Sequence, residues 1–216
     1  MTIDAPVCNT ILRGMATILW SLATLYAQGI VIFYPGVFVF WFIVHPNIDR
    51  LRPWGPRAYL AVAAFAWFVT AGPLFLLRRR MFSLDWSLPQ PFQGIVAGIG
   101  ITALILAITV FRQATKQIPF RTLIGIAEIE PHKTKQPMLN SGIYSKTRNP
   151  IYFAHWLLVF AAAAVSGFAA NWIMFALDCM IVPLLIFAEE RELLARYGRD
   201  FSDYMRRVPR FFPQLR

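Results

Sequence analysis

Apolar residues gather in long runs that are separated by short polar segments. The first run, residues 15–44, has 30 residues, whereas one membrane-spanning helix needs about 20 and two helices need about 40. We therefore expect one long, tilted helix rather than a hairpin. Gly29 and the Tyr-Pro-Gly triplet at 34–36 are expected to bend it, and the His-Pro-Asn triplet at 45–47 is expected to end it.

Four further apolar runs follow, each long enough or nearly long enough to cross a membrane. The segment between the second and third of these, 112–149, is too polar to span and includes a short stretch, 122–129, that is expected to lie at the membrane surface as a helix. The last two runs are joined by a short turn, which predicts an antiparallel hairpin. The fold class predicted is therefore an all-α integral membrane bundle of five transmembrane helices, at 15–44, 58–77, 92–111, 150–166 and 169–188.

One face of the third run carries small residues at a spacing of four, namely Gly94, Gly98 and Thr102. Small side chains let two helix backbones approach closely within a membrane. We expect this stripe to be a helix-packing surface rather than a functional site.

Composition agrees with a membrane protein and narrows the possible partners. Hydrophobic residues make up 57% of the 216 residues and charged residues 15%, against about 25% charged in a typical soluble domain. The net charge of +10 is interpreted as anchoring to anionic lipid, so no nucleic-acid partner is expected. Cys8 and Cys179 have neither a metal-binding spacing nor a plausible disulfide partner, so no metal site is expected.

The basic residues are distributed unevenly over the two sides of the five-helix arrangement. One side receives 17 of the 21 Lys and Arg residues, from the segments 50–57, 112–148 and 191–216. The positive-inside rule places that side in the cytoplasm, with the N-terminus outside. No cleavable signal peptide is expected. The prediction is a multi-pass protein of the inner or plasma membrane whose polar segments face the cytoplasm.

The fourth helix is preceded by a polar, charged segment, G-I-Y-S-K-T-R-N-P-I-Y at 142–152. Asn149 is predicted to be the N-cap and Pro150 the first helical residue, because proline suits that position. Free N–H groups at this helix start, together with Arg148, favour an anion there. The alternative is an ordinary membrane-helix start with Arg148 as an interfacial anchor.

A second charged cluster begins where the hairpin leaves the membrane, in the segment 188–213. The antiparallel hairpin brings this end next to Arg148, so a cation and the Glu189–Glu190 pair would meet at the cytosolic rim. Such a site can hold a water-soluble, zwitterionic cofactor against a lipid-soluble substrate. The alternative is a solvated helix end with weak local ion pairs. Asp178, inside the fifth run, is either a functional group or a buried hydrogen-bonding group.

Together the two segments resemble the isoprenylcysteine carboxyl methyltransferase family and its phospholipid methyltransferase relatives. The resemblance covers about the last third of the chain, and Asn149 stands where the family usually has histidine. It implies a single domain, 1–216, in which 1–111 supplies three spans and 112–216 supplies the cofactor-binding part with a cytosolic C-terminal segment. The matching residues are Gly142, Tyr144, Arg148, Pro150 and Tyr152 in the first motif, and Glu189, Glu190, Leu193, Gly198, Tyr204, Val208, Pro209, Arg210 and Pro213 in the second.

The resemblance implies an enzyme that uses S-adenosylmethionine as its methyl donor. Arg148 and Glu190 would be catalytic, with Arg148 orienting the acceptor, and Tyr204 with 208–213 would cover the cofactor. His132 or His45 could supply the imidazole that Asn149 lacks. The residues implied to bind the cofactor are Gly142, Tyr144, Asn149, Pro150, Tyr152, Glu189 and Tyr204.

The methyl acceptor is expected to be lipophilic or small, and the resemblance points to an isoprenylcysteine-like carboxylate. A carboxylate needs no general base because it is already ionised at neutral pH, whereas an amine or thiol would pass a proton to a glutamate. The alternatives are a phospholipid amine N-methyltransferase, a nicotinamide-dependent membrane reductase, and a non-catalytic membrane protein that keeps the fold.

Overall fold

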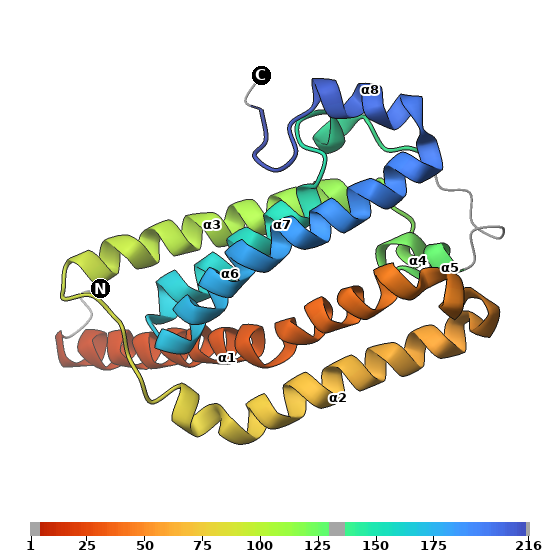
Figure 1. Cartoon of the computed structure of the whole chain (residues 1–216). Coiled ribbons are helices and arrows are strands. Elements are labelled where there is room, and N and C mark those ends of the chain that lie inside the picture. The colour runs from red at the N-terminus through yellow and green to blue at the C-terminus, as the bar shows by residue number, and fades with distance from the viewer. Residues whose placement is uncertain (1–4, 130–136, 215–216) are drawn as a thin grey trace.

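The computed structural model describes residues 5–129 and 137–214, and in these residues the chain is helical apart from loops and one isolated bridge between Asp85 and Phe168. The predicted all-α class is therefore confirmed. Figure 1 shows the helices side by side in an elongated bundle. The elements are α1 (Ala5–Leu51), α2 (Gly55–Met81), α3 (Phe92–Thr115), α4 (Phe120–Leu123), α5 (Ile126–Ile129), α6 (Pro150–Ser166), α7 (Ala169–Tyr197) and α8 (Arg199–Arg207), with 3₁₀ turns at Arg52–Trp54 and Gly142–Ser145.

Three stretches of the described chain are long and apolar enough to cross a membrane: Thr10–Met81, Phe92–Thr115 and Ala169–Tyr197. The first of them contains both α1 and α2, which pack against each other. Helix α6 is apolar but has only 17 residues. The chain is thus an integral, multi-pass membrane protein, while the number of five spans is not confirmed and stays a prediction.

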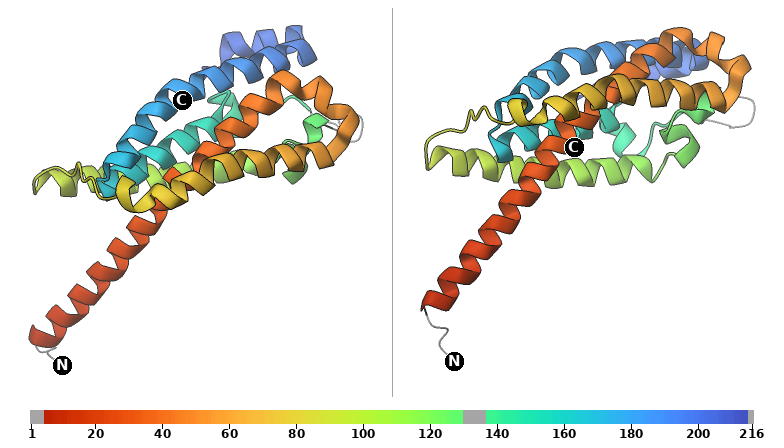
Figure 2. Two further views of the ribbon diagram at one scale, coloured as in Figure 1. Left: turned by 60° about the horizontal axis from the view of Figure 1, so that its bottom comes forward. Right: turned by 90° about the horizontal axis from the view of Figure 1, so that it is seen from below.

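Helix α1 is longer than its sequence pattern predicts. It runs through the triplet at 45–47 and ends at Leu51, so the predicted helix end at that triplet is wrong. Pro46 removes one backbone hydrogen bond, but Val44 and Ile48 on either side of it are buried in an apolar cluster that holds the helix together. Figure 1 shows α1 bending about midway, and Figure 2 shows its first part projecting away from the other helices.

Helices α3 and α6 pack closely, but not through the predicted stripe. Gly98 has open space around it, and Thr102 is exposed. The contact instead runs through Gly100, Ala103 and Ala107, which are buried. A methyl group on Gly100 would come within 2.8 Å of the Ala164 Cβ atom in α6. The predicted packing surface at Gly94, Gly98 and Thr102 is therefore wrong, because the contact uses another face of α3. The physical reason for the prediction, close backbone approach over small residues, still applies.

The predicted surface helix at 122–129 forms as two short helices, α4 and α5, with a break at Gly125. Gly125 has a φ of +77°, and a side chain there would meet Trp41 and Tyr59. The chain therefore turns at this point and fits against α1 and α2 instead of continuing as one helix.

The polar elements collect at one end of the bundle. In Figure 1 the Arg52–Trp54 turn, α4, α5 and α8 all lie at that end. The α6–α7 turn lies at the opposite end, where the backbone N–H of Trp86 donates to the Gly167 carbonyl over 2.9 Å. This arrangement separates the basic segments 50–57 and 191–210 from Arg78, Arg79 and Arg80, as the five-helix prediction requires.

We expect a cytoplasmic location for the end that carries α8. The reason is the 17 to 4 distribution of basic residues over the two sides, which the positive-inside rule converts into an orientation. A reporter fused after residue 216 that is active only in the cytoplasm would agree with this. Activity of that fusion only outside the cytoplasm would contradict it.

Candidate functional site

A cavity of about 380 Å³ lies at the α8 end of the bundle, inside the size range of small-molecule sites. Side chains from α1, α3, α4, α6, α7 and α8 line it, together with the loops at 137–139 and 144–149. Residues of the two sequence motifs therefore meet around one cavity. Predicted site residues among those lining the cavity are Tyr144, Arg148, Asn149, Pro150, Tyr152, Glu189 and Tyr204.

Gly142 and Glu190 are the predicted site residues that do not line the cavity. Gly142 has a φ of +58°, and a methyl group there would lie 2.4 Å from the Gln117 Nε2 atom. The glycine is thus required by the turn at the start of residues 142–149, which are here called the motif loop. Glu190 is one residue along α7 from Glu189, so its side chain points to a different side of the helix and away from the cavity.

Arg148 and Glu190 form a buried ion pair. The Arg148 Nε atom donates to Glu190 Oε1 over 2.9 Å, and the two side chains are 7% and 4% exposed. The Arg148 Nη1 atom also donates to the carbonyls of Met205 (2.7 Å) and Val208 (2.8 Å). The planar guanidinium group therefore joins α7 to the last turn of α8 and to the residue that follows it.

The residues 205–214, here called the closing segment, are held against the motif loop by main-chain hydrogen bonds as well. The Arg148 N–H donates to the Pro209 carbonyl (2.9 Å), and the Gln214 N–H donates to the Lys146 carbonyl (3.0 Å). Thr147 Oγ1 donates to the Phe211 carbonyl over 2.8 Å. These contacts fix the loop that presents Tyr144 and Asn149 to the cavity.

Asn149 occupies the predicted N-cap position of α6, but its side chain does not cap the helix. Its Nδ2 atom donates instead to the Arg210 carbonyl (2.8 Å) and to Glu190 Oε1 (3.2 Å). Arg210 adds a second ion pair to Glu190 at 2.9 Å. The predicted side-chain cap is therefore wrong, because the Asn149 amide donates to the closing segment and to Glu190 instead. Glu190 thus accepts hydrogen bonds from three side chains.

The side of the cavity nearest α8 is polar. Glu189 interacts there with the hydroxyl of Tyr152, and its ionisable neighbours are His45, Glu190 and Glu192. Glu192 in turn pairs with Arg196 at 2.6 Å and lies 3.5 Å from the His45 Nδ1 atom. His45 lines the cavity and stacks on the Trp41 ring, with 4.8 Å between the ring centres.

Tyrosine hydroxyl groups complete this polar side. Tyr204 Oη donates to the Tyr144 carbonyl over 2.6 Å, and burial raises the pKa of Tyr204 to about 12. Burial also raises the pKa of Tyr144, whose neighbours include Glu189. The Tyr144 Oη atom is buried and has no hydrogen-bond partner among the residues described. A buried polar atom in this state indicates a place for a ligand or water.

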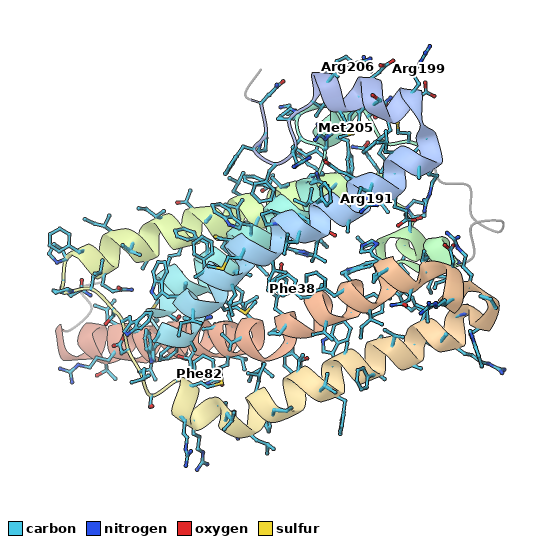
Figure 3. The ribbon with its side chains drawn as sticks, viewed as in Figure 1. Phe38, Phe82, Arg191, Arg199, Met205 and Arg206 are labelled. Carbon is cyan, nitrogen blue, oxygen red and sulfur yellow. The ribbon has the colours of Figure 1, made fainter. Side chains whose placement is uncertain are left out.

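Several cavity residues were not anticipated from the sequence. His155 and Tyr34 line its inner part, together with Phe38 and Phe111. His155 follows Ile151 by four residues, and this helical spacing places both on one face. That spacing is the signal that could have identified His155 once Pro150 was taken as the helix start. Figure 3 shows Phe38 on the side of α1 that faces α7.

Across residues 5–129 and 137–214, no group of three or more His, Cys, Asp or Glu side chains is placed to hold a metal ion. Cys179 is a free thiol. Of the two histidines considered from the sequence as substitutes for Asn149, His45 reaches the cavity, and His132 lies outside the described residues.

Comparison with known proteins gives distant similarities. The chain is 32% identical to methanethiol S-methyltransferase 2 of Bradyrhizobium diazoefficiens over 89 residues, which are 41% of this chain and 32% of that protein. It is 33% identical over 79 residues to the cobalt-zinc-cadmium resistance protein CzcN of Cupriavidus metallidurans, covering 36% of each. It is 30% identical over 78 residues to the nickel-cobalt-cadmium resistance protein NccN of Alcaligenes xylosoxydans xylosoxydans, covering 36% of this chain and 37% of that protein.

The matches thus span about a third of the length of these curated relatives. No family model matches the chain. No solved structure matches it either. The similarities thus include a methyltransferase, and they do not extend to isoprenylcysteine as a substrate.

Proposed function

We propose that this protein is an integral membrane methyltransferase that uses S-adenosylmethionine. The observation that carries the proposal is the cavity at the α8 end, which residues of both sequence motifs line. The similarity to a methanethiol S-methyltransferase supports the same class of reaction. The two resistance proteins are matched about as closely, and their names give no reaction.

The cavity fits the proposed methyl donor in its chemistry as well as in its size. S-adenosylmethionine carries a positive sulfonium and ammonium group, a carboxylate and an aromatic base. Glu189 offers a carboxylate, Asn149 and Tyr144 offer polar groups, and the Trp41 ring offers a π-face for a cation or a base. When bound, the donor supplies an electrophilic methyl group.

The protein's own residues would align the two reactants and exclude water. Displacement at a sulfonium disperses charge, so orientation and a dry site account for most of what an enzyme must supply. Tyr204 of α8 lines the polar side of the cavity, and the closing segment holds the motif loop that presents Tyr144 and Asn149 to it. Arg148 and Glu190, proposed from the resemblance as the catalytic pair, act in this arrangement by fixing the closing segment and the motif loop.

The proposal is tested by equilibrium binding of S-adenosylhomocysteine to the detergent-purified protein, followed by transfer of a labelled methyl group. The acceptor panel should contain a small thiol, a phospholipid amine and an isoprenylcysteine carboxylate. We expect saturable binding and transfer to one acceptor class. Binding without any transfer would favour a non-catalytic protein that keeps the fold, and absence of binding would contradict the proposal.

A further inference from the structure

The residues that line the cavity become more apolar with increasing distance from α8. Along α7 its lining residues change from Leu185 to Glu189 and Glu192, and the separation of seven positions between Leu185 and Glu192 corresponds to about 10 Å. Along α1 they change from Tyr34 and Phe38 to His45 in the same direction. The inner part, lined by Tyr34, Val37, Phe38, Phe111, His155 and Leu185, is here called the deep end.

His155 brings an imidazole group to the deep end. Its ring is nearly perpendicular to that of Tyr34, with 5.7 Å between ring centres, and is stacked on Phe111 at 5.9 Å. Within the residues that the structure describes, the His155 side chain makes no hydrogen bond and no ion pair. A neutral imidazole has one donor and one acceptor nitrogen, so His155 can accept a proton from a molecule in the cavity.

Tyr34 connects His155 to a buried carboxyl group. Its ring packs against His155, and its hydroxyl is the side-chain group that interacts with Asp178 of α7. Asp178 is fully buried, and neither of its oxygen atoms has a hydrogen-bond partner at normal distance within the described chain. An ionisable side chain buried in an apolar hairpin is costly, which favours a functional reason for its presence.

The charges around the cavity argue against an anionic acceptor. Arg148 and Arg196 are the Lys or Arg residues that line it within the described ranges. Arg148 forms an ion pair with Glu190 and hydrogen bonds with two carbonyls, and Arg196 is paired with Glu192. Glu189, in contrast, faces the cavity with two carboxylates among its neighbours. A carboxylate acceptor would find neither Lys nor Arg among the residues that line the deep end, whereas a group that must lose a proton would find the His155 imidazole there.

On the basis of the proposed methyltransferase function, we propose that the deep end is the acceptor subsite and binds a molecule that loses a proton from sulfur or nitrogen. His155 takes that proton, while Tyr34 and Asp178 are positioning residues that hold the imidazole ring. For a thiol, the S–H bond breaks and its electron pair stays on sulfur. The sulfur then bonds to the methyl carbon as the bond from that carbon to the sulfonium breaks, leaving its electrons on the departing thioether. His155 later releases the proton to water.

The test compares acceptors of different acidity in the wild type and in His155→Gln. Glutamine keeps the polarity of the site but does not take up a proton. With an alkanethiol, which is mostly protonated at pH 7, we expect turnover to fall about 100-fold. With an electron-poor aromatic thiol, already ionised at pH 7, the fall should be less than about 10-fold, because general-base assistance is then not required. An alkylamine should behave like the alkanethiol.

Three further measurements separate this role from a structural one. S-adenosylhomocysteine affinity of His155→Gln should stay within about threefold of the wild type, since the deep end is not the cofactor side. Tyr34→Phe should show a smaller loss with the same dependence on acceptor acidity. His45→Gln, a matched change of the histidine on the polar side of the cavity, should show no such dependence.

The outcomes distinguish the two proposals. Equal losses with both thiols in His155→Gln would make His155 a packing residue and overturn the inference. Tight S-adenosylhomocysteine binding with transfer only to a carboxylate, or to no thiol or amine, would overturn the inference while leaving the cofactor site intact. A wild type that does not bind S-adenosylhomocysteine would overturn the proposed function, and this inference with it.

Discussion

Replacing Arg148 with methionine is expected to destabilise the protein by about 3–5 kcal/mol, the usual cost of removing one partner of a buried ion pair. Glu190 would keep its Arg210 partner, but that side chain is 51% exposed and its charge is partly solvated. The Met205 and Val208 carbonyls would also lose their guanidinium donor. The measurement is thermal or denaturant unfolding in detergent, with the wild type as reference.

A matched control is Arg196→Met, which removes an ion pair with Glu192 spaced four residues apart on the same helix. Because both of those side chains are about a quarter exposed, we expect a loss of only about 0.3–0.5 kcal/mol. The double variant Arg148→Met/Glu190→Leu should recover part of the loss, since replacing both charges by apolar groups is often neutral. Equal stability of Arg148→Met and the control would mean that the buried pair does not hold the closing segment.

Arg148→Lys separates two roles of this arginine. Lysine keeps the charge but cannot reach Glu190 and the two carbonyls at once, because it lacks the planar fork. The observed contacts predict that cofactor affinity and turnover fall together as the closing segment loosens. If Arg148 orients the acceptor directly, as the resemblance implies, turnover should fall while S-adenosylhomocysteine affinity is kept.

Replacing Glu189 with glutamine is expected to weaken S-adenosylhomocysteine binding about 10- to 100-fold. The ligand's ammonium group would lose a charged hydrogen-bond partner, which is worth about 1.5–3 kcal/mol. Tyr152→Phe should cost less, about 3- to 10-fold, because it removes a hydroxyl that interacts with Glu189 and no charge. Calorimetric titration of the purified variants measures both effects.

Asp203→Asn serves as the control, because Asp203 lies on α8, does not line the cavity and pairs with Arg206. Figure 3 shows Arg206 at the outer side of α8, away from the bundle. The affinity of this variant should equal that of the wild type. Unchanged affinity in both Glu189→Gln and Tyr152→Phe would place the cofactor somewhere other than the polar side of the cavity.

The arrangement of helices could be predicted well from the sequence, and the network at the site only in part. Apolar runs and the short turn before Ala169 were enough to predict the α6–α7 hairpin, and this hairpin brings Arg148 next to Glu190. The ends of the helices were harder to predict from the sequence. The 45–47 triplet and Ala188 both looked like boundaries, yet tertiary packing carries α1 to Leu51 and α7 to Tyr197.

The partners of the motif side chains could not be read from residue types. Arg148 and Asn149 bind main-chain carbonyls of the closing segment, and a carbonyl looks the same at every position of a sequence. His155 was overlooked for a different reason. A single histidine in an apolar run is most simply a packed residue, and only the cavity shared by α1, α3 and α6 distinguishes it.

The pairing of the motif loop with the closing segment has a consequence for the order in which the protein is made. The contacts join residues about 60 positions apart, such as Arg148 with Val208 and Thr147 with Phe211. The whole α6–α7 hairpin therefore emerges from the ribosome, and enters the bilayer, before the loop that precedes it can find its partner. Contacts of such long sequence separation form late because a large loop must close first. The helices are thus inserted before the site is complete, and they pass through a stage in which the motif loop lacks its partner in the closing segment.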